Sequence, residues 1–206
     1  MPRSEEQNEA IRRESRKRIL EQALTLFAQH GYDRTTVRMI AQEAGIAQGL
    51  LYNYFRSKKD VLQALFEQSM TKVFESFALV ADRPPAEKLE ALIRGSFALV
   101  ARDRDFWKVS YGVRMQSAVL ADLGPDLGGW TQSIRLGLCA ILTEAGVPAP
   151  EIEARILFAL IDGISQHLVL EPDYPIEAVT VALLRRYFVP SAPKEGKTSR
   201  SSRKPS

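Results

Sequence analysis

The chain has 206 residues, and its 45% apolar and 26% charged residues are typical of a globular protein with one large domain or two small ones. The 28 basic and 25 acidic residues leave a net charge of +3, too small to indicate a nucleic-acid partner by itself. The charge is segregated, however. Residues 1–60 carry +3, residues 61–189 carry −4 and residues 190–206 carry +4, which predicts different functions for the basic ends and the acidic middle.

Several classes of protein are disfavoured by simple counts. The single cysteine, Cys139, excludes an intramolecular disulfide. No apolar stretch approaches the ~18 residues of a membrane helix, and the charged N-terminal residues do not resemble a signal peptide. The two histidines, His30 and His167, are far apart, and no metal-binding or phosphate-loop pattern occurs. We therefore expect a soluble cytoplasmic protein that is not an enzyme, with no metal, no cofactor and no membrane association.

The periodicity of the apolar residues is helical from end to end. Ile19, Ala23 and Phe27 are spaced four residues apart, and no segment alternates with the period of a strand. The sequence predicts an all-α fold of about nine helices, at residues 14–30, 36–44, 48–55, 57–80, 85–101, 104–119, 127–145, 150–170 and 176–189. Residues 1–13 are expected to form a flexible arm, and residues 190–206, rich in serine, lysine and proline, a disordered basic tail.

A helix-turn-helix is predicted at about residues 36–55. Thr36 suits the N-cap of a short helix, and Gly45 permits a sharp reversal directly after it. The next helix would turn Leu51 and Phe55 inward, so that two short helices pack across a glycine turn.

The outer face of the second short helix has the polar character that a major-groove reader needs. Gln48, Gly49, Tyr52 and Asn53 can donate, accept or approach a base closely. The hydroxyl of Tyr54, like that of Tyr52, suits phosphate oxygens.

A basic helix start follows this motif. Ser57 and Asp60 have the spacing of a capping box. Lys58 and Lys59 lie in the first turn, where the helix dipole disfavours cations by ~0.3–1 kcal/mol unless a phosphate binds there. These residues predict nucleic-acid binding by residues 14–60, against the alternative of a helical hairpin that merely packs.

The same region resembles the TetR family of bacterial transcriptional regulators. The resemblance covers about residues 14–65 and is carried by the run from Thr36 to Ile46, then Gly49, Leu51, Tyr52, Tyr54, Phe55, Ser57 and Lys58. It implies a dimeric DNA-binding repressor that a small ligand releases from its operator. It also implies that Thr36 and Arg38 contact the backbone or groove edge, that Gln48, Gly49 and Leu50 face bases, and that Tyr52, Tyr54 and Lys58 hold phosphates.

Two positions depart from the family's usual pattern. Ala47 stands where serine is common, which removes a helix cap worth ~1 kcal/mol. Leu50 replaces a small residue or threonine, and it either contacts a thymine methyl group or packs against its own domain.

Residues 61–189 are expected to bind an effector and to dimerise. The helix at 150–170 is apolar nearly all round, so it is buried either between two subunits or within one large core. We expect a two-fold interface that contains the helices at 150–170 and 176–189. The candidate interface residues are Ala159, Asp162, Gly163, Leu184 and Phe188.

Aromatic residues are concentrated between residues 57 and 146, where they either line a cavity for an apolar ligand or simply form core. The candidate cavity residues are Phe74, Phe97, Trp107, Tyr111, Arg114, Met115 and Trp130. Arg114, Gln116 and His167 are candidates for polar contacts with that ligand.

The sequence thus favours a homodimeric regulator that binds double-stranded DNA and an unidentified small-molecule effector. The alternative is an all-α dimeric interaction module without specific DNA binding. The basic tail either adds nonspecific attraction to DNA or only keeps the protein in solution.

Overall fold

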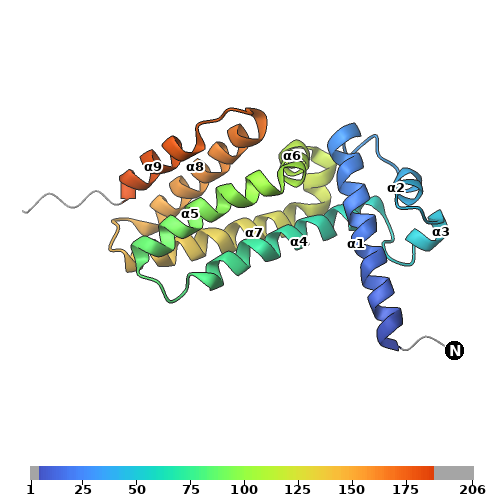
Figure 1. Cartoon of the computed structure of the whole chain (residues 1–206). Helices are drawn as coiled ribbons and strands as arrows, with labels where there is room; N and C mark the ends of the chain where they lie inside the picture. Colours follow the sequence, from blue (N-terminus) through green and yellow to red (C-terminus); the bar gives the residue numbers. More distant parts are fainter. Residues whose placement is uncertain (1–4, 188–206) are drawn as a thin grey trace, which may run out of the picture.

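Nine α-helices make up the part of the chain that this computed structural model describes, residues 5–187, with the side chains of Ala118, Leu120 and Asp122 excepted (Figure 1). The predicted all-α class is confirmed. The helices are α1 (Glu5–His30), α2 (Val37–Glu43), α3 (Gln48–Leu51), α4 (Lys58–Leu79), α5 (Pro85–Arg102), α6 (Arg104–Val113), α7 (Ser117–Glu144), α8 (Pro150–Leu170) and α9 (Ile176–Tyr187). The predicted basic tail, residues 190–206, lies outside the described residues.

Helix α1 begins much earlier than the sequence suggested. It starts at Glu5, so the expected flexible arm over residues 1–13 is wrong for residues 5–13. Glu5 and Glu6 favour the helix because acidic groups in a first turn interact well with the helix dipole. Glu9 and Arg13 are spaced four residues apart, in the order that supports a helix. Local charge patterning therefore extends α1 through a segment where few apolar residues indicate a helix.

Two hydrophobic cores divide the molecule. The first joins α1, α2 and α3 to the start of α4, to α6 and to the start of α7, and the second joins the end of α4 to α5, α8, α9 and the end of α7. In Figure 1, α1–α3 form one end, and α4, α5, α7 and α8 run side by side away from it. Because Phe106, Val109 and Val113 of α6 lie in the first core, the boundary expected at residue 60 is not a boundary in packing.

Helix α7 runs through a predicted break. The predicted helices at 104–119 and 127–145 left a gap at residues 120–126, which includes Gly124 and Pro125, but α7 is continuous from Ser117 to Glu144 with Pro125 inside it. Leu123 is buried before the proline, and Leu127 and Trp130 pack against the same core after it. Tertiary packing on both sides thus overrides the local preference for a break.

Candidate nucleic-acid interface and ligand cavity

The predicted helix-turn-helix is present, with a shorter second helix than expected. The hydroxyl of Thr36 accepts the N–H of Met39 at 3.2 Å, which confirms its role as N-cap. Gly45 adopts φ +65°, the left-handed conformation that the sharp reversal requires. Helix α3 ends at Leu51 instead of residue 55. Its N-cap, Ala47, makes no side-chain cap bond, as expected from the missing serine.

Seven of the nine predicted DNA-contacting residues are exposed in the free protein. They are Thr36, Arg38, Gln48, Gly49, Leu50, Tyr52 and Asn53. Leu50 is 43% exposed, so it is available to a base and does not pack into its own domain. Tyr54 is partly buried against the first core. The turn and α3 therefore present a polar surface held from behind by the buried Leu51 and Phe55.

The start of α4 is capped as predicted. The hydroxyl of Ser57 accepts the N–H of Asp60 at 3.1 Å and donates to its carboxylate at 2.8 Å. The carboxylate also accepts the N–H of Arg56 at 3.0 Å. This reciprocal capping box fixes the segment that joins α3 to α4.

Lys58 is more engaged than the sequence suggested. Its ammonium group donates to the carbonyl of Tyr32 at 2.7 Å and to that of Asp33 at 3.3 Å, and lies 4.2 Å from the centre of the Tyr32 ring. Partial burial lowers the pKa of Lys58, while the charge of Asp33 opposes this shift. The hydrogen bonds to these two carbonyl groups offset the unfavourable position of a cation at a helix N-terminus. To contact a phosphate, the ammonium group of Lys58 would have to keep these hydrogen bonds while binding it, or give them up.

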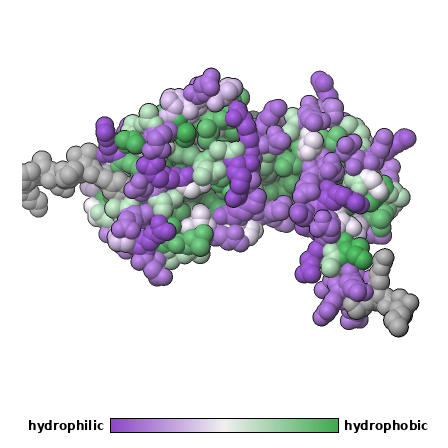
Figure 2. Space-filling view, in the orientation of Figure 1, coloured by the Kyte–Doolittle hydropathy of each residue, from purple (hydrophilic) through white to green (hydrophobic). Residues whose placement is uncertain are grey.

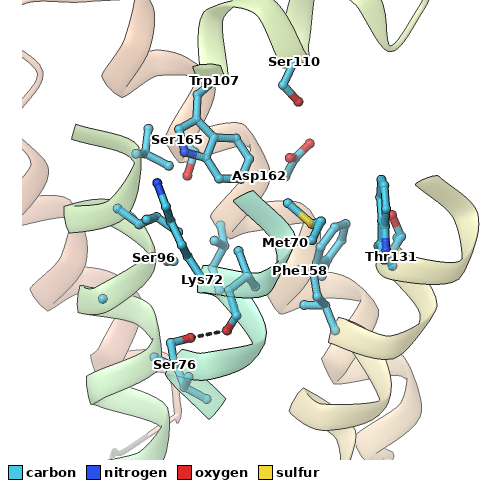
Figure 3. Close-up of a pocket in the computed structure, with 18 of the residues that line it drawn as sticks. Met70, Lys72, Ser76, Ser96, Trp107, Ser110, Thr131, Phe158, Asp162 and Ser165 are labelled. Atoms are coloured by element: carbon cyan, nitrogen blue, oxygen red, sulfur yellow. Dashed lines mark hydrogen bonds between the residues drawn. The ribbon is translucent and has the colours of Figure 1, made fainter. Parts of the chain in front are cut away.

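A cavity of about 780 Å³ lies among α4–α8, between the two cores (Figure 3). Phe66 and Trp130 line it from the first core and Leu138 from the second. Ser96, Ser110, Thr131 and Ser165 place hydroxyl groups in an otherwise largely apolar wall. This volume is within the usual range for small-molecule sites.

One polar cluster in the cavity joins α6 to α8. The guanidinium group of Arg114 donates to the carboxylate of Asp162 at 3.0 Å and lies 4.6 Å from the centre of the Tyr111 ring. The hydroxyl of Tyr111 donates to the backbone carbonyl of Asp162 at 3.4 Å. Burial raises the pKa of Tyr111 to about 12, aided by the charge of Asp162 and opposed by that of Arg114.

The cavity contains four of the seven residues that the sequence predicted: Trp107, Tyr111, Arg114 and Trp130. The other three are not among the residues that line it. Phe97 is buried in the second core, Met115 is 85% exposed and Phe74 does not line the cavity.

The two further polar candidates also lie outside the cavity lining. The side-chain amide of Gln116 donates to the carbonyl of Gly112 at 3.2 Å, and the ring of His167 lies 2.6 Å from the carboxylate of Glu171.

Sequence reasoning missed the contribution of α8 to the cavity. Phe158, Ile161, Asp162 and Ser165 all line it, at the i, i+3, i+4 and i+7 spacing of one helix face. The signal was present in the sequence, but it was hidden because the helix is apolar on its other faces as well.

The predicted interface residues separate into two groups. Asp162 is paired with Arg114 within the chain, and Leu184 is buried in its own core, so both side chains already have partners in a single copy. Ala159 is exposed, and a Cβ added to Gly163 would meet nothing within 4 Å. Phe188 lies outside the described residues.

Two kinds of feature are absent from residues 5–187. No group of three His, Cys, Asp or Glu side chains is placed to hold a metal ion. Nor is any helix there both long and apolar enough to cross a membrane.

Sequence comparison places each part of the chain in the same family. A family model described as "Bacterial regulatory proteins, tetR family" matches residues 19–65. Another, described as "BetI-type transcriptional repressor, C-terminal", matches residues 85–189, just over half of the chain.

Curated relatives agree with these matches. The fatty acid metabolism regulator protein of Bacillus subtilis is 35% identical over 89 residues, 42% of this chain and 46% of that protein. The chain therefore spans less than half the length of this relative, and the match to the repressor KstR2 of Mycolicibacterium smegmatis covers 42% of that protein. The regulator BetI of Serratia proteamaculans is 25% identical over 184 residues, 84% of this chain and 90% of that protein.

Solved structures show the same fold. The fatty acid degradation regulator FadR of Bacillus halodurans superimposes with a TM-score of 0.72 at 21% identity, covering 84% of this chain and 94% of that one. FadR of Bacillus subtilis in complex with stearoyl-CoA gives a TM-score of 0.70 at 23% identity, covering 83% and 96%. With family models that match residues 19–65 and 85–189 and with this shared fold, the chain belongs to the TetR family of bacterial transcriptional regulators.

Proposed function

We propose that the protein is a cytoplasmic, homodimeric repressor that binds an operator in double-stranded DNA and releases it when a small molecule occupies the cavity. The observation that carries the DNA-binding role is the exposed polar surface of α2, the turn and α3. Arg38 and Tyr52 supply donors for phosphates there, and Gln48 supplies an amide for base edges. An interaction module without DNA binding would not need this set.

The DNA-binding role is tested by selecting duplexes from a random-sequence pool with the full-length protein. Tyr52→Phe should weaken binding to a selected duplex and to a scrambled duplex alike, because it removes a phosphate contact. Gln48→Ala should weaken binding mainly to the selected duplex, because it removes base recognition. Arg185→Gln, on α9 at the other end of the molecule, is the control. Unchanged binding by both Tyr52→Phe and Gln48→Ala would reject the assignment.

The dimer is proposed to form through the outer stripe of α8. Ile152, Ile156 and Leu170 are 57%, 40% and 73% exposed, and with Ala159 and Gly163 they repeat at helical spacing along one face. A two-fold axis that pairs this stripe with its copy would bury it and place two α3 helices in successive major grooves, roughly 34–36 Å apart. Ile156→Arg should produce monomers in sedimentation experiments, and a persistent dimer would place the interface elsewhere.

The cavity is proposed to take a ligand whose buried part is uncharged and mostly apolar. Of the charged groups in the lining, Arg114 is paired with Asp162 at 3.0 Å, Lys72 and Arg102 share Asp103 at 2.7 and 3.1 Å, and Glu75 is exposed. A ligand charge buried beside the Arg114–Asp162 pair would therefore lack a free partner, at a cost of several kcal/mol. The relative solved with stearoyl-CoA is consistent with this class, since an acyl chain is uncharged and apolar.

Ligand binding can be measured with the protein's own tryptophans. The chain has two, Trp107 and Trp130, and both line the cavity. Apolar ligands of increasing chain length should change their fluorescence and lower DNA affinity at the same concentrations. Ser96→Leu, which adds bulk to the cavity wall, should weaken both effects, whereas Ser133→Leu on the exposed face of α7 should not. Fluorescence changes without any loss of DNA binding would reject the regulatory role.

A further inference from the structure

We propose that residues 12–18 of α1 form a second DNA-contacting surface, which binds phosphates of the same duplex that α2 and α3 contact. This inference depends on the proposed DNA-binding function and extends it to a segment outside the helix-turn-helix. The partner is duplex DNA because phosphate groups are the chemistry that a dense, exposed row of guanidinium and ammonium groups fits.

Residues 12–18 have a higher density of positive charge than any other segment of the same length in the chain. It contains five basic residues and one acidic residue, a net charge of +4 against +3 for the whole chain. All five basic side chains, Arg12, Arg13, Arg16, Lys17 and Arg18, are exposed. The −4 carried by residues 61–189 hides this concentration in the overall composition.

The direction of this surface follows from the register of α1. Ile19, Ala23 and Phe27 are buried and define the face that α1 turns toward the first core. Arg16 precedes Ile19 by three residues and Arg12 precedes it by seven, and both separations return to the same face of a helix. Arg16 and Arg12 therefore continue the packed face of α1 beyond the point where the core ends.

A direct contact places this face beside the helix-turn-helix. The guanidinium carbon of Arg16 lies 5.1 Å from the centre of the Phe55 ring, in the segment that directly follows α3. Tyr52 and Tyr54, both predicted to contact phosphates, precede Phe55 by three residues and by one. The basic residues from Arg16 to Arg12 thus begin beside the segment that holds the proposed DNA-binding surface from behind.

Helix α1 extends beyond α2 and α3, and its basic residues lie on the extended part. Figure 1 shows α1 projecting beyond α2 and α3, and Figure 2 shows mostly hydrophilic side chains on this projection. At 1.5 Å per residue, Arg12 lies about 10 Å along the axis from Ile19. A rigid projection of this kind can reach phosphates beyond those that α3 contacts and holds its charges in place at a lower entropic cost than a flexible arm would.

The test compares variants of the full-length chain on the selected duplex and on its scrambled counterpart. Arg12→Gln together with Arg13→Gln should lower affinity for both duplexes. It should also reduce the slope of log affinity against log salt by about 0.9 for each lost phosphate contact. For each lost contact, the ratio of wild-type to variant affinity should therefore be about eightfold larger at 0.1 M salt than at 1 M salt. Arg12→Lys with Arg13→Lys should retain most of the binding, because the charge remains.

Arg185→Gln together with Arg186→Gln is the matched control. It removes the same charge from exposed positions on α9, at the other end of the molecule, and should leave the slope unchanged. If the wild-type protein binds and the α1 variant has the same affinity and slope, the inference is rejected while the proposed function stands. If the wild-type protein binds no duplex in the selection, the proposed function itself fails.

Discussion

The ion pair between Arg114 and Asp162 joins α6 to α8 and lies beside Tyr111. We predict that removing either charge weakens this link and that the two removals shift the pKa of Tyr111 in opposite directions. At 3.0 Å and an effective dielectric constant of about 20, the attraction is about 5 kcal/mol before desolvation is counted. The two side chains are 27% and 30% exposed, so water and lost side-chain entropy cancel most of this energy. We expect a net coupling energy of about 1–2 kcal/mol, above the value for fully exposed pairs.

The assay is a double-mutant cycle of Arg114→Gln, Asp162→Asn and the double variant, with the free energy of unfolding measured in urea. The pKa of Tyr111 supplies a second readout, because the charge of Asp162 raises it and that of Arg114 lowers it. Asp162→Asn should therefore lower the pKa of Tyr111 from about 12, and Arg114→Gln should raise it. Tyrosinate absorbance measured against a Tyr111→Phe background isolates this residue.

Opposite shifts would not arise from general loosening, since both variants would then move the pKa of Tyr111 in the same direction. Shifts of equal sign, or a coupling energy indistinguishable from zero, would refute the view that this pair joins α6 to α8.

Three further outcomes follow from single positions. Gly45→Ala should lower the free energy of unfolding by about 1–2 kcal/mol because φ is +65° there. Gly128→Ala, where an added Cβ meets open space, should not destabilise the protein. Equal effects of the two substitutions would contradict the turn geometry. Ser57→Ala should cost about 1 kcal/mol through loss of the cap to Asp60, measured in urea, and no change would mean that the box is dispensable. Stability should fall as pH rises from about 10 to about 12, because the folded-state pKa of Tyr111 lies above its unfolded value, so the stabilisation is complete below pH 10 and is lost above it. Tyr111→Phe should flatten this decline in a series of urea titrations, and an unaltered decline would assign it to other groups.

The helix-turn-helix was predictable because its determinants are local. The caps formed by Thr36 and Ser57 each act over three residues, and Gly45 needs only its own backbone angle to reverse the chain. The start of α1 was missed for a related reason. Residues 5–13 contain few apolar positions to indicate a helix, although their charges are spaced to support one.

The cavity was only partly predictable because it depends on how distant helices face one another. Phe97 and Leu99 lie two residues apart on α5, yet Phe97 packs into the second core and Leu99 lines the cavity. Asp162 and Gly163 are adjacent on α8, yet Asp162 points to the cavity and Gly163 to open space. Composition identified the right region, but the choice between neighbouring residues is made by helix register, which no local pattern reports.

The position of the cavity between two cores bears on how a ligand could reach the DNA-binding surface. Helix α4 contributes Val61 and Phe66 to the first core, lines the cavity with Met70 and Phe77, and begins directly after the capping box at Ser57. A displacement of α4 at the cavity would therefore move the segment that fixes α3, and α6, which packs on α1, would offer a parallel route. Only a ligand that binds one arrangement of these helices better than the other can shift the balance between them. A molecule that fills the cavity equally well in both arrangements should leave DNA affinity unchanged, however tightly it binds.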